Sequence, residues 1–339
     1  MTRPARSALG AFVTLLLLWW VLRDVSPAEV FAELREASPW WLALAVGLAT
    51  FSFVLRAARW RVLLEPGHVG SSFETRFGAT CTGFAANNLF PARVGELIRA
   101  YVLSRMAAVP FGASVGSLVV ERVLDGLVLA IFLIVPIVLP GFPLGDTAAA
   151  GRIHRVALVA SIAFALGFAV LWAAARRPEG AHRLWQRTGG RVVPARFAER
   201  LDGLVDTFVH GLGALGRPTV LLRAVLWSFV VWMCLALSIW MGLLAFRVTD
   251  PGFLGAVFLQ SVIAFAVAVP STPGFFGVFE AGVRVGLEPW DVSDPAIVGF
   301  ATSYHILTFI PVTLIGLWYV RRVGLRWTEV RRRPAEEVG

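Results

Sequence analysis

The sequence contains no lysine and has few charged residues of any kind. All 31 basic residues are arginine, and charged residues make up 16% of the 339-residue chain. A soluble domain carries about 25% charged residues, so the composition argues against a soluble globular class. With 57% hydrophobic residues and a mean hydropathy of +0.73, the chain has the composition of an integral membrane protein.

Cysteines and the common catalytic motifs are also scarce. The two cysteines, Cys81 and Cys234, lie within apolar runs, which excludes a disulfide framework and a cysteine-based metal site. The motifs G-x-x-x-x-G-K-[ST], H-E-x-x-H and C-x-x-C are missing. The one G-x-S-x-G match, at Gly112–Gly116, opens an apolar run instead of joining a strand to a helix, so it is not a nucleophile elbow. Because no pair of nucleophile and base is apparent either, we expect no enzymatic activity, no cofactor and no metal ion.

The formal net charge is +9, but the arginines flank apolar runs instead of lining one face. We therefore expect no nucleic-acid partner. Arginines beside apolar spans mark the cytoplasmic side of a membrane. On this rule Arg56, Arg59 and Arg61 end the second span in the cytoplasm. Arg3 and Arg6 place the N-terminus on the same side.

Apolar runs of membrane-spanning length recur along the chain. We expect six spans, at about Ser7–Leu22, Pro39–Leu55, Gly112–Leu139, Ile153–Ala175, Thr219–Phe246 and Pro295–Val320. No small-residue cleavage site follows the first run, so we interpret it as an uncleaved helix and not as a signal peptide. The sequence thus predicts a single domain over residues 1–339 in the bacterial inner (plasma) membrane, with both termini in the cytoplasm.

Two connections have helical patterns of their own. The run Ser26-Pro27-Ala28-Glu29 has the pattern of a capping box with proline at the first helical position, which predicts a short surface helix. The basic connection 176–217 is expected in the cytoplasm, and apolar residues at helical spacing between Phe197 and Leu215 predict an interfacial helix within it. Residues 321–339 are expected to be a basic cytoplasmic tail.

Two further apolar stretches are broken by proline. Phe73–Phe90 and Arg93–Ala108 lie on either side of Pro91, and the charges of the second arm cannot face lipid along its length. Gly252–Val269 is followed by Gly274–Leu287, which at about 1.5 Å per residue is too short to span a bilayer. We expect two re-entrant helical hairpins that enter from opposite faces of the membrane.

Each hairpin lies between two spans, and the two groups run in opposite senses. This is the pattern of an inverted repeat with discontinuous helices that meet near the midplane. The expected fold is an all-α polytopic membrane protein with about six transmembrane helices plus two re-entrant hairpins. If each hairpin were two full crossings, every other loop would stay on the same side, so charge does not distinguish this fold from eight or more spans.

The first hairpin carries a dense group of polar residues. These candidates are Asn87, Asn88, Arg93, Glu96 and Arg99. Charged groups at membrane depth are costly and commonly have a function. A half-helix N-terminus offers free N–H groups, and arginine offers a fork that matches phosphate, so we interpret the group as an anion site. The alternative is an Arg–Glu pair that only holds the hairpin to its neighbours.

The second hairpin repeats the order of proline, glycine, glutamate and arginine. Its candidates are Thr272, Gly274, Gly277 and Glu280, with Arg284 one turn later. Glycine permits close backbone approach and proline exposes carbonyl groups, although a purely structural kink would have the same pattern. Because Glu280 is expected beside Arg284, this hairpin would be close to neutral. Together the hairpins predict an anionic or zwitterionic lipid headgroup as the ligand.

Two of the spans add titratable residues. Glu121 and Asp125 share a helix face, with Arg122 between them, and they are expected to pair with arginines of the first hairpin or within their own helix. These three residues complete the candidate headgroup site. His305 in the last span has two interpretations, a proton relay or, preferred here, a hydrogen-bonded packing residue.

The chain resembles the transmembrane region of lysylphosphatidylglycerol synthetase at three motifs, which stand in the family's order. They are N-N-L-F-P-A-R-V-G-E-L-I-R at Asn87–Arg99, E-R-V-L-D at Glu121–Asp125 and P-S-T-P-G-F-F-G-V-F-E at Pro270–Glu280. Arg59-Trp60 fits the same pattern. Phe275 stands where the family has a second glycine, so the backbone there is expected to approach a ligand less closely.

The resemblance implies a flippase-like domain that moves a phospholipid between leaflets. In the full synthetase a separate cytoplasmic domain transfers lysine from tRNA to phosphatidylglycerol; with residues 321–339 alone after the last span, we expect the stand-alone form without it. Two functions stay open. The protein is a flippase or scramblase with a polar cavity between the hairpins, or a non-transporting subunit that binds lipid for a partner lipid-modifying enzyme or glycosyltransferase. In both cases a membrane phospholipid is the expected partner.

Overall fold

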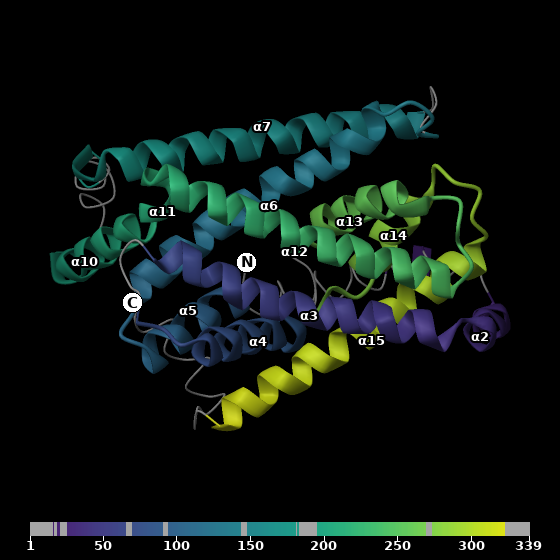
Figure 1. The fold of residues 1–339 in the computed structure, drawn as a ribbon, viewed down its shortest axis with the longest axis horizontal. Helices are drawn as coiled ribbons and strands as arrows, with labels where there is room; N and C mark the ends of the chain where they lie inside the picture. The colour runs from purple at the N-terminus through teal and green to yellow at the C-terminus, as the bar shows by residue number, and fades with distance from the viewer. Residues whose placement is uncertain are drawn as a thin grey trace.

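The computed structural model describes Leu16, Trp19, Trp20 and residues 26–65, 70–90, 94–143, 148–180, 182, 195–268 and 273–322. Arg93 and Thr272 lie outside these residues, as do most of the first predicted span and the C-terminal tail. Within the described ranges every regular element is a helix (Figure 1). The elements are α2 (Pro27–Glu36), α3 (Pro39–Leu64), α4 (Phe73–Leu89), α5 (Gly95–Met106), α6 (Phe111–Val138), α7 (Ala148–Arg176), α10 (Ala195–Gly211), α11 (Gly213–Gly216), α12 (Pro218–Ala245), α13 (Gly252–Ala268), the 3-10 turn η1 (Pro273–Phe275), α14 (Val278–Leu287) and α15 (Asp294–Arg322).

Three of the described helices, α3, α12 and α15, are long and apolar enough to cross a membrane. They have 26, 28 and 29 residues and correspond to the predicted second, fifth and sixth spans. The predicted end of the second span at Leu55 is wrong, because α3 continues to Leu64. Arg56 and Arg59 therefore lie inside a helix that continues beyond them, and both are buried.

Both predicted connecting segments form helices, and their placement at the membrane surface stays a prediction. Ser26 and Glu29 form the expected capping box of α2, in which Ser26 N–H donates to Glu29 Oε2 over 2.9 Å and Glu29 N–H donates to Ser26 Oγ over 3.3 Å. The helix predicted between Phe197 and Leu215 corresponds to α10 and α11. One side of α10 packs against the first turns of α6, so part of its apolar face is covered by protein.

Both predicted hairpins are pairs of antiparallel helices. Gly83 of α4 lies against Gly95 and Arg99 of α5. A Cβ atom at position 83 would come within 2.7 Å of the Gly95 carbonyl oxygen and of the Arg99 Cβ atom. Gly282 of α14 lies in the same way against Ile263 of α13. The four helices of the hairpins have 10 to 17 residues. At a rise of about 1.5 Å per residue, each is shorter than the roughly 30 Å hydrocarbon core of a bilayer. Their re-entrant placement in the membrane stays a prediction.

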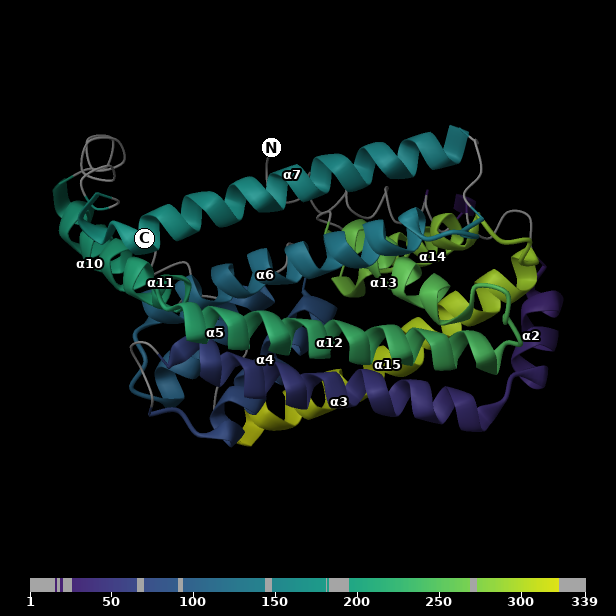
Figure 2. The same cartoon turned by 45° about the horizontal axis from the view of Figure 1, so that its top comes forward.

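The two halves of the chain pack by the same plan. The first half is α3, the α4–α5 hairpin and α6, and the second half is α12, the α13–α14 hairpin and α15. The first helices, α3 and α12, run along each other, while α4 packs on α15 and α13 packs on α6 (Figures 1 and 2). The longer arm of each hairpin is thus held by the last helix of the other half. The polar motifs of both hairpins consequently lie near the interface between the halves.

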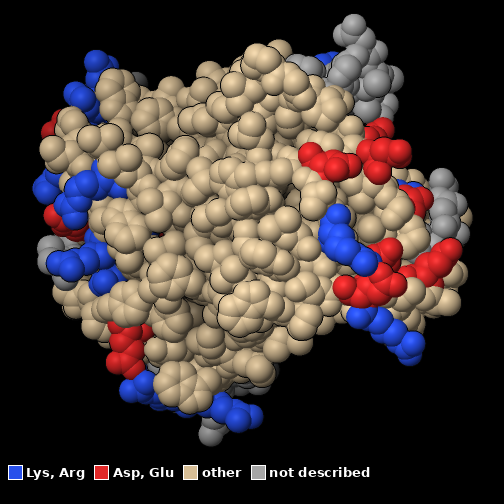
Figure 3. Space-filling model, turned by 45° about the vertical axis from the view of Figure 1, so that its right-hand side comes forward, with Lys and Arg blue, Asp and Glu red and all other residues tan. Residues whose placement is uncertain are grey.

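The surface has a broad uncharged belt between two charged ends (Figure 3). The exposed apolar side chains of the described residues include Leu222 and Leu226 of α12 and Leu314 and Trp318 of α15. In the view of Figure 3 arginines gather toward one end, whereas acidic residues are prominent at the other. This distribution fits a multi-pass membrane protein, since an apolar belt is covered by lipid and the charged ends face water.

Candidate functional site

A cluster of charged side chains lies inside the helices, where α3, α5 and α6 meet. Its members are Arg56, Arg59, Glu96, Arg99, Glu121, Arg122 and Asp125. Arg56, the most exposed of the buried five, is 4% exposed, and Arg59 and Glu121 are completely buried. With four arginines and three carboxylates, the ionised cluster carries a net charge of 4 − 3 = +1.

Arg59 connects three helices at the centre of this cluster. From α3 its guanidinium binds Asp125 through both terminal nitrogens, and its Nη2 lies 3.1 Å from Oε1 of Glu121 in α6. Its Nη1 also donates to Ser228 Oγ of α12 over 2.8 Å. Asp125 accepts a further hydrogen bond from Trp232 Nε1 of α12, at 2.8 Å. A buried charge pair of this kind is stabilised by further hydrogen bonds to its members, which Ser228 and Trp232 supply here, although Nε of Arg59 has no hydrogen-bond partner in the described chain.

Arg99 holds the short arm of the first hairpin to the same carboxylates. Its Nη1 and Nη2 donate to Oε1 and Oε2 of Glu121 over 2.7 and 3.2 Å, which confirms the expected pairing of Glu121 with an arginine of the hairpin. The guanidinium lies 4.0 Å from the ring centre of Trp60, a cation–π contact. Trp60 is fixed in turn by a 3.0 Å hydrogen bond from Nε1 to Ser117 Oγ.

Arg122 and Glu96 form the solvent-accessible edge of the cluster. Their side chains are 37% and 30% exposed, and Arg122 Nη2 lies 3.5 Å from Glu96 Oε1. Arg122 also approaches Glu121 at 3.4 Å and Asp125 at 4.0 Å. The charged candidates on α5 and α6 therefore come together as one group, with Arg122 and Glu96 as its partly exposed members.

Arg56 differs from the other arginines of the cluster because its charge is poorly matched. In the described chain the Nε atoms of all four arginines are buried without a hydrogen-bond partner, but Arg56 alone of the four also has a buried Nη atom, Nη1, without one. The carboxylate of Asp125 is 3.9 Å from Nη1, and the guanidinium otherwise faces the rings of Phe84 and Trp232 at 5.2 and 5.1 Å. Phe84 belongs to α4 and Trp232 to α12, so this cation lies between the two halves.

Sequence reasoning missed Arg56 and Arg59 as site residues. Both were interpreted as the cytoplasmic flank of a span, because arginine runs commonly occupy that position. The sequence nevertheless holds a signal, since Val62, Leu63 and Leu64 continue the apolar pattern after the arginines, and all three are buried. Arginines inside an apolar run point to paired, functional charges and not to a helix end.

The two asparagines of the first hairpin have structural partners. Oδ1 of Asn87 accepts the backbone N–H of Gly95 over 2.8 Å and so caps the start of α5. Nδ2 of Asn88 donates to Thr313 Oγ1 of α15, also over 2.8 Å. Both amides thus fix the hairpin, one to its own second arm and the other to the opposite half.

Glu280 of the second hairpin has a different partner from the expected one. Its Oε2 accepts the Gly277 N–H over 2.6 Å, and its Oε1 lies 2.7 Å from Nδ1 of His305 in α15. Arg284 pairs instead with Asp294 at 2.9 Å, because the last turn of α14 faces the first turn of α15. The prediction that Glu280 and Arg284 form a neutral pair is therefore wrong. His305 is buried and hydrogen-bonded, a position that fits both interpretations of this residue.

Glycine is required at two positions around the break in the second hairpin. Gly274 and Gly277 have φ angles of 71° and 82°, a region that residues with a Cβ atom rarely adopt. Phe275, which stands in place of the family's second glycine, also has a positive φ of 62°. Backbone strain of this kind is concentrated at functional sites in proteins.

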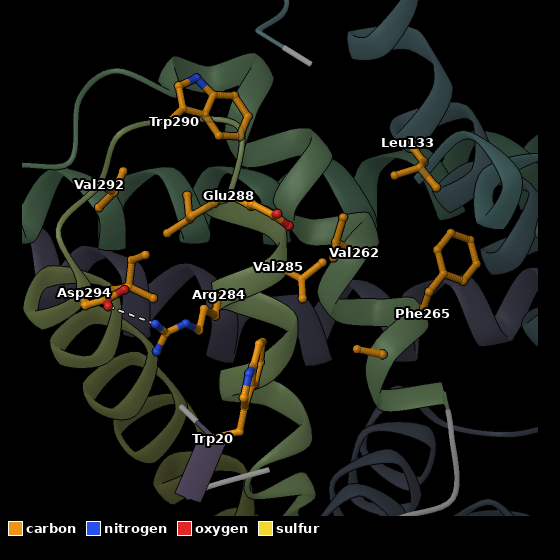
Figure 4. A pocket seen from close by; sticks show the side chains of 13 residues that line it. Trp20, Leu133, Val262, Phe265, Arg284, Val285, Glu288, Trp290, Val292 and Asp294 are labelled. Carbon is orange, nitrogen blue, oxygen red and sulfur yellow. Dashed lines mark hydrogen bonds and ion pairs between the residues drawn. The ribbon is translucent and has the colours of Figure 1, made fainter. Parts of the chain in front are cut away.

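A cavity of about 740 Å³ lies on the far side of the second hairpin (Figure 4). Apolar residues of α6, α13 and α14 line most of it, including Leu133, Val262 and Phe265. The ion pair of Arg284 and Asp294 stands at one side. None of the predicted site residues lines this cavity, so it is separate from the charged cluster.

The family model of the lysylphosphatidylglycerol synthase transmembrane region matches residues 7–316. The chain belongs to this family. Glycosyltransferase AglD of Haloferax volcanii is 28% identical over 93% of this chain and 54% of its own length, so this chain spans about half of AglD. A UPF0104 membrane protein of Methanothermobacter thermautotrophicus is 25% identical over 89% of this chain and 88% of its own. The resemblance inferred from the three motifs is thereby confirmed.

The structure predicts opposite stability effects for the two buried arginines of α3. Replacing Arg59 by glutamine removes the main partner of Asp125 and one of the three arginine partners of Glu121, and we expect a loss of about 3–5 kcal/mol in stability. The Arg56→Gln substitution removes a buried cation whose Nε and Nη1 atoms have no hydrogen-bond partner. The melting temperature of this variant in detergent should therefore stay at or above that of the wild type. Equal destabilisation of both variants would contradict the inference that Arg59 stabilises the fold and Arg56 does not.

Proposed function

We propose that this family member binds a membrane phospholipid by its phosphate at the buried charged cluster and moves it between the two leaflets. The observation that carries the proposal is the excess positive charge of the cluster, located at Arg56. A purely structural network has no need for a fourth arginine, since buried ions are costly and apolar packing of the same volume is commonly as stable. A bound phosphate would supply the missing acceptor for Arg56.

A lipid phosphate suits this position better than a soluble anion. Arg56 is flanked by aromatic rings inside an apolar bundle, so its ligand has to enter from a membrane environment. The guanidinium fork matches phosphate oxygens in a bidentate manner. Membership of the lysylphosphatidylglycerol synthase transmembrane family points to the same class of ligand.

The edge of the cluster supplies a preference among headgroups. Glu96 is partly exposed and pairs with Arg122 at 3.5 Å, a distance at which a competing donor can displace one partner. An amine or the hydroxyl groups of a sugar can donate to this carboxylate while Arg56 holds the phosphate. The preferred ligand is therefore an anionic or zwitterionic phospholipid, or a lipid-linked headgroup of similar charge.

The alternative function is a non-transporting subunit that presents a lipid to a partner lipid-modifying enzyme or glycosyltransferase. Its support is the similarity to AglD, a glycosyltransferase of which this chain spans about half. In this alternative the same cluster binds the same headgroup, but the lipid is not released to the other leaflet. In neither case do we assign a chemical reaction or a cofactor to the chain itself.

Reconstituted vesicles test both candidates. With labelled phosphatidylglycerol as the probe, the wild type should accelerate exchange between leaflets, and Arg56→Gln should reduce the rate and the binding about tenfold, the equivalent of 1.4 kcal/mol for one interaction. Arg223→Gln is the matched control, because Arg223 is an exposed arginine of α12 that pairs with Glu65.

One outcome of this experiment would distinguish the two candidate functions, and another would contradict both. Binding that depends on Arg56, without any exchange between leaflets, would select the non-transporting subunit. Competition by neutral diacylglycerol as strong as that by phosphatidylglycerol, with Arg56→Gln silent, would contradict the headgroup site in both.

We further propose that the protein lies in the bacterial inner membrane with both termini in the cytoplasm and with two re-entrant hairpins. In a variant without Cys81 and Cys234, Asn88→Cys should react slowly with impermeant thiol reagents from either side. Arg61→Cys should react from the cytoplasm and Asp250→Cys from the outside, since both positions are exposed at helix ends. Rapid labelling of Asn88→Cys from the outside would favour full crossings over a re-entrant hairpin.

A further inference from the structure

Glu280 and His305 form a buried titratable pair that the headgroup site does not use. Glu280 is 3% exposed and His305 is 6% exposed, and their Oε1 and Nδ1 atoms are 2.7 Å apart. The pair joins α14 to α15 within the second half of the molecule. Buried carboxylate–histidine groups inside membrane helices are typical of proton pathways.

Aromatic rings enclose the imidazole. Phe279 stacks on His305 with ring centres 4.3 Å apart and planes at 25°, and Phe276 lies 4.7 Å away at 36°. Phe309 contacts the ring edge-on at 6.3 Å. These contacts keep the imidazole in one orientation, with Glu280 as its hydrogen-bond partner.

Few other charged groups face the pair from the surrounding helices. On α14 the second charged residue, Arg284, is paired with Asp294 of α15. Helix α13 contains no Asp, Glu, Arg or His, and the neighbouring Tyr304 of α15 hydrogen-bonds with Ser238 of α12 over 2.8 Å. The remaining charged residues of the packed helices are Glu74 and Arg76 of α4, Arg223 of α12, Arg56, Arg59 and Arg61 of α3, Arg321 and Arg322 at the end of α15, and Glu29, Glu33, Arg35 and Glu36 of α2.

The pair is also mechanically connected to the break in the second hairpin. Oε2 of Glu280 accepts the N–H of Gly277, the residue before α14, so the same carboxylate caps the helix and holds the imidazole. The residues ahead of this cap, Gly274 and Phe275, have positive φ angles. A change in the charge of Glu280 therefore acts directly on the start of the short helix, since a carboxylate at a helix N-terminus is stabilised by the helix dipole.

We infer that Glu280 and His305 are a proton-binding site, and that its loading is coupled to the lipid movement proposed above, on which this inference rests. With the Nδ1–H donated to the carboxylate, one proton from water adds to Nε2 and changes the pair from a net charge of −1 to neutral. In the described chain no hydrogen bond occupies Nε2. Release of the same proton on the opposite side of the membrane restores the ionised pair, so that one proton crosses for each cycle.

A structural role for the two residues predicts a different response to substitution. Glu280→Gln keeps an oxygen that can accept the Gly277 N–H, and His305→Asn keeps a donor near the position of Nδ1. Both variants preserve hydrogen-bonding capacity but remove the titratable groups. Glu288→Gln is the matched control, because Glu288 is an exposed carboxylate at the end of the same helix.

The experiment uses the full-length protein in vesicles of phosphatidylethanolamine and phosphatidylglycerol, with a pH-sensitive dye inside and labelled phosphatidylglycerol as the lipid probe. In the wild type an imposed pH gradient should change the initial rate of lipid exchange at least tenfold and should drive a proton flux. Glu280→Gln and His305→Asn should lose both responses, whereas Glu288→Gln should retain them.

The outcomes distinguish this inference from the proposed function. Lipid exchange that is unaffected by the gradient and accompanied by no proton flux in the wild type would overturn the proton site and leave lipid movement intact. Absence of lipid exchange under every condition would contradict the proposed function. The proton flux of the wild type tests for coupling even if a variant does not fold. An unchanged proton flux in the folded Glu280→Gln variant would assign the proton path to other residues.

Discussion

The ion pairs from Arg59 to Asp125 and Glu121 are the interactions on which the arrangement of the first half depends. Because Asp125 also binds Trp232, these pairs connect α3, α6 and α12 at one buried point. Arg99 uses the other edge of Glu121 and attaches the first hairpin to the same point. Once both carboxylates are occupied in this way, Arg56 is left with an unmatched charge, which makes the site suitable for a phosphate.

The second half uses the same architecture with less charge. In each hairpin an acceptor side chain caps the short arm: Asn87 binds the N–H of Gly95, and Glu280 binds that of Gly277. The cap of the first hairpin is neutral, while the cap of the second is a carboxylate shared with His305. A fixed half that carries the headgroup charge and a titratable half that responds to protons would together provide the asymmetry that directed transport requires.

Local patterns in the sequence predicted most of the helices and much of the site. The capping box of Ser26, the proline-broken hairpins and the glycines at positions 274 and 277 follow from short-range chemistry and are found where expected. The partners of Arg59 and Arg284 could not be predicted, since each lies on another helix of the same half and is brought close only by tertiary packing. Charge counting assigned the arginines of α3 to the surface because it takes no account of burial by neighbouring helices.

The central claim is that Arg56 binds a lipid phosphate while the other ion pairs of the cluster stay intact. The most direct measurement is an experimental structure of the protein in nanodiscs that contain phosphatidylglycerol with brominated chains. The account predicts a phosphate within hydrogen-bonding distance of the Arg56 guanidinium, with Arg59 still on Asp125 and Arg99 still on Glu121. A structure in which the Arg56 guanidinium binds Asp125 directly, and no lipid phosphate lies near the cluster, would contradict it.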